Sequence, residues 1–388
     1  MQAVSGFVLR ASLVISSREA GSFGLEFPCP KSLYGRYSTR DAGCSRSAHA
    51  LMPSLPETRI VIMNATQSRR NFLKQASLLP LCAVAGPPMN NAVAACTPIQ
   101  RVGGARLKVG LNAYSFSKEL NDHVKGRGPG MSLFQLLDFC AEHNFDAIDA
   151  TGYFFPGYPK VPEDSYINDF KRRAFQLGLD ISGTGVRNNF TDPDAGNRAA
   201  DVKHIKEWVE VAAKLGAPVL RVFVDTQRRD TTWEQIAKGH TRDEVAAWIS
   251  ANLKECAEHG KKYGVIIGVQ NHGDFVKTGE QHIKLLKLVD SEWCGAIVDT
   301  GYYVTKDPYA DMAAVTPYAV NWQIKESPFG KDSEVRTDLK RLLKLVRAGD
   351  FRGYLPIETL SIPGRDYVPR ELVPKFLKQV QDAIAATA

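Results

Sequence analysis

The sequence predicts a closed (β/α)8 barrel, and two observations support that prediction. From residue 107 onward, short apolar runs recur, and each run ends in polar residues and is followed by an amphipathic stretch. The runs are rich in Val, Ile or aromatic residues, which is typical of buried parallel strands. Their alternation with helical patterns favours a parallel sheet closed into a barrel. An open doubly wound sheet is the alternative, but "NAYSFS" is not the Gly-rich turn expected after its first strand.

The apolar runs define the predicted strands in chain order. They cover residues 107–116, 146–155, 179–186, 217–225, 265–272, 295–303, 319–327 and 354–360. Between them, apolar residues recur at helical spacing. The clearest helical patterns cover residues 131–144, 205–216, 242–264, 280–290, 339–350 and 369–386, and a weaker one covers 309–318. Gly216 and Gly264 end two of these patterns, where glycine is a favourable C-cap.

The N-terminal region does not show the pattern of the barrel. "SRRNFLK", residues 68–74, is followed by the apolar stretch "ASLLPLCAVAG" and then by the small-residue site "AVA" at residues 92–94. This order resembles a twin-arginine export signal and implies a periplasmic protein. Such signals begin a chain, so we expect Met63 to be the true start, or residues 1–62 to be a disordered extension. A lipoprotein attachment at Cys96 is less favoured, because prolines and asparagines separate it from the apolar run.

The chain is therefore expected to contain one folded domain. The expected segments are an extension at 1–62, a signal at 63–94, a linker at 95–106 and the barrel at 107–388. Residues 1–94 hold 10 of the 49 Lys and Arg residues and 4 of the 42 acidic residues, which leaves 39 basic and 38 acidic residues. This near-neutral balance argues against a nucleic-acid partner, and no membrane association is expected after signal cleavage.

Polar residues gather at the ends of the predicted strands. In a barrel of this kind the functional groups lie at the carboxyl ends of the strands. Residues two apart share a face of a strand, so Gln270 can point with His272, and Gln323 with Lys325. The polar residues at these ends are Arg221, Asp225, Gln270, Asn271, His272, Asp299, Gln323, Lys325, Glu326 and Glu358.

Asp299 and Glu358 are acids among these residues that follow apolar neighbours. Asp299 lies in "IVDTG" and Glu358 in "PIETL", and a buried carboxylate is costly without a partner. A divalent metal ion would compensate both charges. Helix capping, or pairing with Arg or Lys, would also do so, and the residues alone leave both explanations open.

These motifs resemble the xylose-isomerase-like barrels, a family of sugar phosphate isomerases and epimerases that also includes endonuclease IV. The resemblance covers residues 107–386 and rests on "QNHG", "VDTG", "QIKE" and "IETL" on successive strands. It implies one divalent metal ion held by Gln270, Asp299, Gln323 and Glu358. Mn²⁺ is favoured, and Mg²⁺, Co²⁺ or Zn²⁺ would also suit the ligands.

Two of the four ligand positions depart from the family pattern. Gln270 stands where the family has Glu, and Gln323 stands where it has His. An amide oxygen can still bind a hard cation, but Gln270 cannot accept a proton from a substrate. Glu358 is then the expected base, with Lys325 or His272 as the second acid or base.

The remaining candidates are substrate contacts. Arg221 is expected to face the substrate or an inner carboxylate, and Asn271 lies beside the expected metal ligands. Phe116 and Tyr153 at the first two strand ends could form an aromatic wall against a sugar ring, although aromatic residues in such places are often core.

The leading functional hypothesis is a metal-assisted isomerase or epimerase that abstracts a proton next to the carbonyl of a non-phosphorylated sugar or keto-sugar. One alternative is an elimination from a 3-keto-glycoside, which needs only one base. A second alternative is a carbohydrate-binding barrel without catalytic activity. A DNA-repair nuclease is disfavoured, because only His272 lies at a clear strand end. The expected partners are a sugar substrate and the twin-arginine export machinery, and a homo-oligomer is compatible with the sequence.

Overall fold

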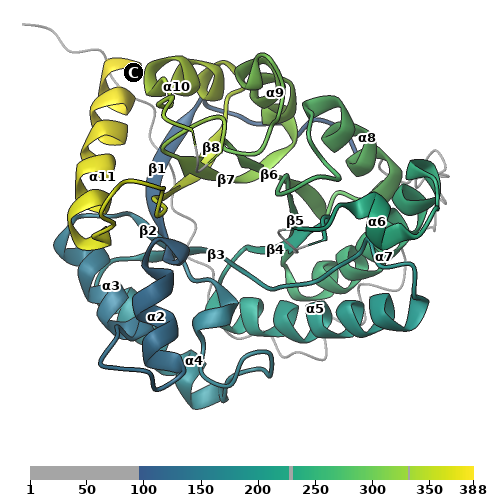
Figure 1. Ribbon diagram of the computed structural model, residues 1–388. Helices are drawn as coiled ribbons and strands as arrows, with labels where there is room; N and C mark the ends of the chain where they lie inside the picture. Colours follow the sequence, from purple (N-terminus) through teal and green to yellow (C-terminus); the bar gives the residue numbers. More distant parts are fainter. Residues whose placement is uncertain (1–95, 227–229, 331–332) are drawn as a thin grey trace, which may run out of the picture. The chain divides into compact units, whose positions relative to one another are not determined.

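The chain forms a closed barrel of eight parallel strands surrounded by helices (Figure 1). The computed structural model describes residues 96–226, 230–330 and 333–388. Each strand pairs with its sequence neighbours, and β8 closes the barrel on β1. The predicted fold class is confirmed. The open-sheet alternative is excluded, because an open sheet would leave two unpaired edges. The predicted export signal and its preceding extension lie outside the described residues.

The strands are shorter than the apolar runs that predicted them, because the polar end of each run leaves the sheet. They are β1 Arg106–Asn112, β2 Ala147–Asp149, β3 Asp180–Gly185, β4 Val219–Phe223, β5 Ile266–Gln270, β6 Cys294–Asp299, β7 Ala319–Lys325 and β8 Arg352–Glu358. After β1 and β2 the chain turns at once into the short 3₁₀ helices η1 Ala113–Phe116 and η2 Gly152–Phe154. A third such turn, η3 Thr316–Tyr318, precedes β7.

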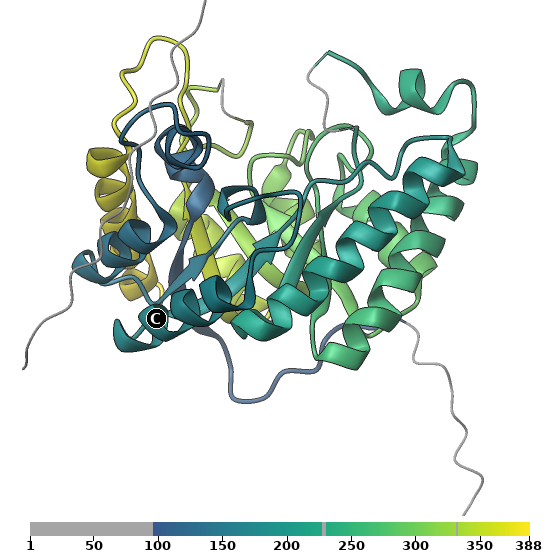
Figure 2. The same ribbon diagram turned by 90° about the horizontal axis from the view of Figure 1, so that it is seen from below.

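The helices form the outer ring, which Figures 1 and 2 show from two directions. They are α2 Ser117–Val124, α3 Leu133–Glu142, α4 Asp164–Gln176, α5 Ala195–Leu215, α6 Trp233–Ala237, α7 Arg242–Tyr263, α8 Gly279–Val289, α9 Pro308–Val315, α10 Leu339–Ala348 and α11 Pro369–Ala386. The predicted C-caps are confirmed: Gly216 ends α5 and Gly264 ends α7, both in the left-handed conformation. Within the described residues, no helix is both long and apolar enough to span a bilayer.

The alternation along each strand separates two environments. On β7, Trp322 and Ile324 belong to the hydrophobic core, while Asn321, Gln323 and Lys325 alternate with them and are also buried. The second set makes polar contacts to the neighbouring strands β6 and β8 and, across the barrel, to β2. A buried polar group is costly unless it has a hydrogen-bond or charged partner. The barrel interior is therefore a polar network held inside an apolar shell.

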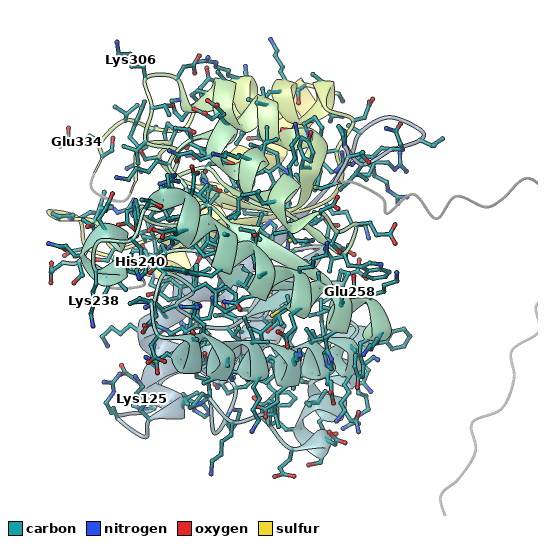
Figure 3. The ribbon with its side chains drawn as sticks, turned by 90° about the vertical axis from the view of Figure 1, so that its right-hand side faces the viewer. Lys125, Lys238, His240, Glu258, Lys306 and Glu334 are labelled. Carbon is teal, nitrogen blue, oxygen red and sulfur yellow. The ribbon has the colours of Figure 1, made fainter. Side chains whose placement is uncertain are left out.

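Charged side chains at the two ends of the barrel identify the face that carries the strand-to-helix loops. In Figure 3, Lys125, Lys238, His240, Lys306 and Glu334 lie toward one end of the molecule, and Glu258 on α7 lies toward the other. The first group belongs to segments that follow β1, β4, β6 and β7. This end is the one at which (β/α)8 barrels carry their functional sites.

Candidate functional site

The carboxyl ends of β6, β7 and β8 place a cation between two carboxylates. Lys325 Nζ lies 2.5 Å from Glu358 Oε1 and 3.5 Å from Asp299 Oδ2. The register pairs Lys325 with Glu358 and Asp299 with Gln323, so the three charged side chains lie at nearly the same level of the barrel. All three are buried. Burial alone would lower the pKa of Lys325, but the nearby charges of Asp299 and Glu358 outweigh it and raise that pKa. The amine is therefore a buried ammonium ion.

Residues at the end of β5 position Asp299. Gln270 donates from Nε2 to Asp299 Oδ2 at 2.6 Å. Asn271 is fully buried, and its side-chain amide makes two hydrogen bonds to the backbone of Asp299. The NH₂ group donates to the carbonyl at 2.9 Å, and the oxygen accepts from the N–H at 2.7 Å. The substrate contact predicted for Asn271 therefore finds no support, because both ends of its side chain hold the end of β6.

Gln323 joins a different part of the barrel. Its Oε1 accepts a hydrogen bond from Asn112 Nδ2 on β1, and its amide also hydrogen-bonds the carboxylate of Asp149 on β2. A carboxylate accepts hydrogen bonds, so the NH₂ group of Gln323 must face Asp149 and its oxygen must face Asn112. Gln323 is thus close to the predicted cluster in register, but it bonds across the barrel toward β1 and β2.

A divalent metal ion does not fit this arrangement. The space between Asp299 and Glu358 holds the ammonium group of Lys325, and the oxygen of Gln323 is bound by Asn112. In the part of the chain that the structure describes, no three His, Cys, Asp or Glu side chains are grouped as metal ligands. Of the four predicted ligands, Gln270, Asp299 and Glu358 share one cluster around Lys325.

His272 and Asp225 form a second catalytic candidate beside the first. His272 Nδ1 lies 3.1 Å from Asp225 Oδ2, and the ring stacks on Tyr302 with centroids 4.1 Å apart. Lys325 Nζ lies 6.0 Å from the centroid of the same Tyr302 ring, so Tyr302 connects the two groups. In the tautomer that carries its proton on Nδ1, His272 donates to Asp225 and Nε2 is the basic nitrogen. Among the described residues Nε2 has no hydrogen-bond partner, and the His272 side chain is 30% exposed.

A glycine allows this pair to form. Gly273 follows His272 and has φ of +98°, a backbone conformation that side chains rarely adopt. A Cβ atom at this position would lie 2.2 Å from Asp225 Oδ2. Only glycine lets the carboxylate approach the loop closely enough to reach the imidazole.

Arg221 and Tyr153 form the opposite part of the site. Arg221 donates to the carbonyl of Val186 at 2.7 Å and to the hydroxyl of Tyr153. Burial raises the pKa of Tyr153 to about 12 although Arg221 lies close, so the phenol is neutral. The two predicted residues therefore lie together, with Arg221 buried and Tyr153 partly buried. Phe116 does not join them: it is buried at the end of η1 against Phe139, with ring centroids 4.9 Å apart, and the predicted wall at this position finds no support.

Asp149 is a site residue that the sequence reasoning missed. It ends β2, is 4% exposed and faces Asn321 Nδ2 at 3.4 Å. Burial raises its pKa to about 6, and the charge of Glu358 adds to this effect, while Arg221 and Gln323 oppose it. The signal was present: "AIDATG" places an acid after apolar neighbours at a strand end, as "IVDTG" does for Asp299.

Asp149→Asn should change how stability depends on pH. The carboxyl titrates near 3.8 when unfolded and near 6 when folded, so the folded state binds its proton more tightly. The free energy of unfolding should therefore fall as pH rises from 4 to 6 and stay lower above that range. Asp149→Asn lacks this loss. Its free energy of unfolding above pH 6 should therefore exceed that of the wild type by up to about 3 kcal/mol. Urea unfolding at pH 4 and pH 7.5 measures the difference.

The control for this measurement is Asp366→Asn, a change at an exposed position. It should leave the difference between the two pH values as in the wild type. If the stability of both variants depends on pH in the same way, then ionising Asp149 does not destabilise the folded protein.

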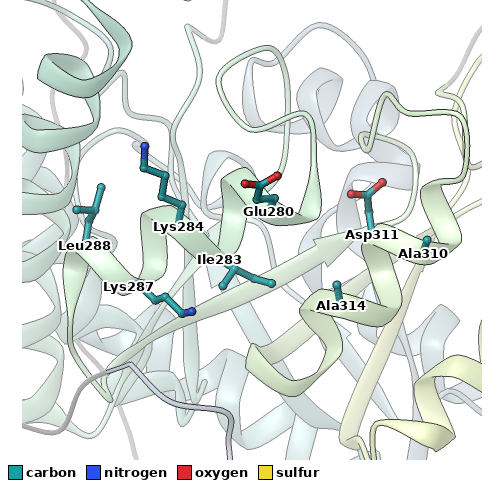
Figure 4. A pocket seen from close by; sticks show the side chains of 8 residues that line it. All are labelled: Glu280, Ile283, Lys284, Lys287, Leu288, Ala310, Asp311 and Ala314. Atoms are coloured by element: carbon teal, nitrogen blue, oxygen red, sulfur yellow. The ribbon is translucent and has the colours of Figure 1, made fainter.

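A small pocket of about 20 Å³, roughly the volume of one water molecule, opens onto the charged cluster. Its lining includes Tyr302, Lys325 and Glu358 together with Leu360 and Ile362 from the loop after β8. Glu326 also lines this pocket. Each of its carboxylate oxygens accepts a hydrogen bond from Arg365 at 2.8 Å. A second pocket lies on the outer surface, where its lining includes Ile283 and Leu288 of α8 and Ala314 of α9 (Figure 4). It contains none of the predicted site residues.

The fold and this interior network define a (β/α)8 barrel with a polar site at the carboxyl ends of its strands. The family model described as xylose isomerase-like TIM barrel matches residues 137–379, and the chain belongs to that family. This confirms the family resemblance. No curated protein matches the chain.

Solved structures share the fold at low sequence identity. A 3-keto-D-glucoside 4-epimerase from E. coli is 12% identical with a TM-score of 0.56, covering 72% of this chain and 99% of its own. A D-psicose 3-epimerase with D-tagatose from Clostridium cellulolyticum H10 is 12% identical with a TM-score of 0.57, covering 71% and 99%. The IOLI protein with a binding zinc atom is 16% identical with a TM-score of 0.56, covering 72% and 99%. Distant structural relatives of this barrel are thus sugar epimerases, and one of the related structures holds zinc.

Proposed function

We propose that the chain is an isomerase- or epimerase-like enzyme that removes a proton next to the carbonyl of a non-phosphorylated sugar or keto-sugar. The observation that carries this proposal is the buried ammonium of Lys325, held by Glu358 and Asp299 where a pocket opens at the strand ends. A fixed positive charge inside a barrel stabilises an oxyanion more strongly than it would in water. The sugar epimerases that share the fold support the choice of substrate class.

His272 is the base that this geometry supports best. The sequence favoured Glu358, but that carboxylate is engaged by Lys325 at 2.5 Å, and a bound carboxylate is a weaker base. His272 has its Nδ1 directed to Asp225 and its other nitrogen without a partner among the described residues. In the proposed reaction, His272 takes the proton from the carbon beside the carbonyl. The carbonyl oxygen becomes an enediolate oxygen that Lys325 stabilises.

The fate of that intermediate distinguishes the reactions. Delivery of a solvent proton to the same carbon from the other face gives an epimer, and transfer of the His272 proton to the neighbouring carbon gives an isomer. Loss of a leaving group on the next carbon gives the elimination proposed for 3-keto-glycosides. Gln270 supports a reaction with a single base, because an amide cannot replace the second carboxylate that removes or returns a proton.

Solvent deuterium tests this proposal. The mature protein is incubated in D₂O with a panel of ketohexoses and 3-keto-glycosides, once with Mn²⁺ and once with a chelator. We expect deuterium beside the carbonyl of at least one sugar, or an elimination product. The two incubations also test the metal assistance that the sequence predicts. Sugar binding without exchange or product in either incubation would overturn the proposal and support the non-catalytic barrel.

We also propose that the protein is exported to the periplasm through its twin-arginine motif. Support comes from the order of paired arginines, apolar run and cleavage site in the sequence. Arg69→Lys together with Arg70→Lys should retain the protein in the cytoplasm of a bacterial host, as cell fractionation measures. Arg106→Lys, at an exposed arginine beyond the predicted cleavage site, is the control. Unchanged periplasmic accumulation of the paired variant, or a mature N-terminus far from residue 95 by mass spectrometry, would contradict this proposal.

A further inference from the structure

The ammonium group of Lys325 lies where the predicted metal ion would bind. Its Nζ lies between the two carboxylates of the predicted metal set, 2.5 Å from Glu358 and 3.5 Å from Asp299. The carboxylate side chains are 6% and 0% exposed, so little water is available to separate the charges. A divalent cation would need the same two carboxylates and the same space.

The amides beside this ammonium are oriented for a site without a metal ion. Gln270 must direct its NH₂ group to Asp299, since a carboxylate offers only acceptors. A glutamate at position 270 would instead repel Asp299 unless a metal ion lay between them. Gln323 is likewise committed, with its NH₂ toward Asp149 and its oxygen bound by Asn112. Both side-chain amides therefore have hydrogen-bond partners without a metal ion.

The net charge of this site also equals that of the family's metal site. The family pattern surrounds a doubly charged ion with three carboxylates and one neutral imidazole, which leaves one net negative charge over the ligands and the ion. Here two carboxylates, Asp299 and Glu358, surround one ammonium, and the net charge is again one negative. Replacing the glutamate by Gln270 removes one negative charge, as replacing the metal ion by an ammonium removes one positive charge.

We propose that Lys325 is the built-in cation of this site and holds the position that a divalent metal ion would need. The inference rests on the proposed function, since both assign the site to stabilising negative charge on a substrate oxygen. An ammonium has three N–H donors. The described residues place Glu358 and Asp299 against it, so at least one donor is available for an enediolate or carboxylate oxygen in the pocket.

Manganese binding measures this directly and requires no sugar turnover. The wild-type protein, purified and dialysed against chelator, is titrated with Mn²⁺ and followed by electron paramagnetic resonance. We expect no stoichiometric binding. One tightly bound Mn²⁺ per chain in the wild type would overturn the inference, while the deuterium experiment would still decide the proposed function separately.

A gain of binding provides the second test. In Gln270→Glu/Gln323→His/Lys325→Met the ammonium is removed and the ligands of the family pattern are restored. This variant should bind one Mn²⁺ at least about tenfold more tightly than the matched control Gln270→Glu/Gln323→His, because the control keeps a cation in the same space. Equal Mn²⁺ binding by the two folded variants, checked by circular dichroism, would refute the claim that Lys325 occupies the metal position. If the triple variant does not fold, the wild-type titration decides alone.

Discussion

Lys325→Met is expected to lower the free energy of unfolding by about 3–5 kcal/mol, because it leaves two buried carboxylates without their cation. Asp299 and Glu358 both rely on this ammonium, and the side chain of Asp299 is fully buried. Methionine has a similar length, so the loss of charge rather than the loss of volume dominates. Urea unfolding at pH 7.5, followed by tryptophan fluorescence, measures the change.

A double variant separates the ion pair from packing. Lys325→Met/Glu358→Gln removes one uncompensated charge and should recover at least about 1 kcal/mol of the loss. Lys344→Met, at an exposed position of α10, is the matched control and should change stability little. If Lys325→Met costs no more than this control, the ammonium does not neutralise the carboxylates in the folded protein.

The barrel was predictable because its two signals are local and repeated. Short apolar runs alternate with helical periods, and each strand needs only its sequence neighbours to be placed in the sheet. Strand ends were less predictable. The apolar run at 107–116 continues through Phe116, but Asn112 accepts from the N–H of Tyr114 and starts a 3₁₀ turn. That turn moves Phe116 from a strand end into the core.

The sequence predicted part of the site's membership, but it missed Asp149 and did not predict the bonds. Strand ends correctly grouped Gln270, Asp299, Lys325 and Glu358, because parallel strands bring their carboxyl ends to one face. Which cation would compensate the carboxylates depended on where one flexible side chain points. Four carbon atoms separate Lys325 Nζ from its Cα, and sequence spacing does not fix their rotamers.

Partners across the barrel were the least predictable part. Asn112 on β1 meets Gln323 on β7, a separation of 211 residues along the chain. Asp225 meets His272 only because Gly273 permits the approach. Such contacts depend on barrel diameter and strand tilt, which no local pattern in the sequence records.

His272→Asn should lower the rate of deuterium exchange on an active sugar by about 10²–10⁴-fold, the usual contribution of a positioned general base. Asparagine keeps a polar side chain of smaller size but has no basic nitrogen. Sugar affinity should change by no more than about threefold if the residue acts mainly on the proton. Exchange rates by NMR, with the dissociation constant by calorimetry, separate the two effects.

Two further variants identify the role of the pair. Asp225→Asn keeps the imidazole but removes the carboxylate that fixes its tautomer, so the exchange rate should fall while the sugar still binds. His240→Asn changes an exposed histidine at the same end of the barrel and should have no effect (Figure 3). If His272→Asn retains the exchange rate and Glu358→Gln abolishes it, the base is Glu358. Lys325 must then release that carboxylate when the substrate binds.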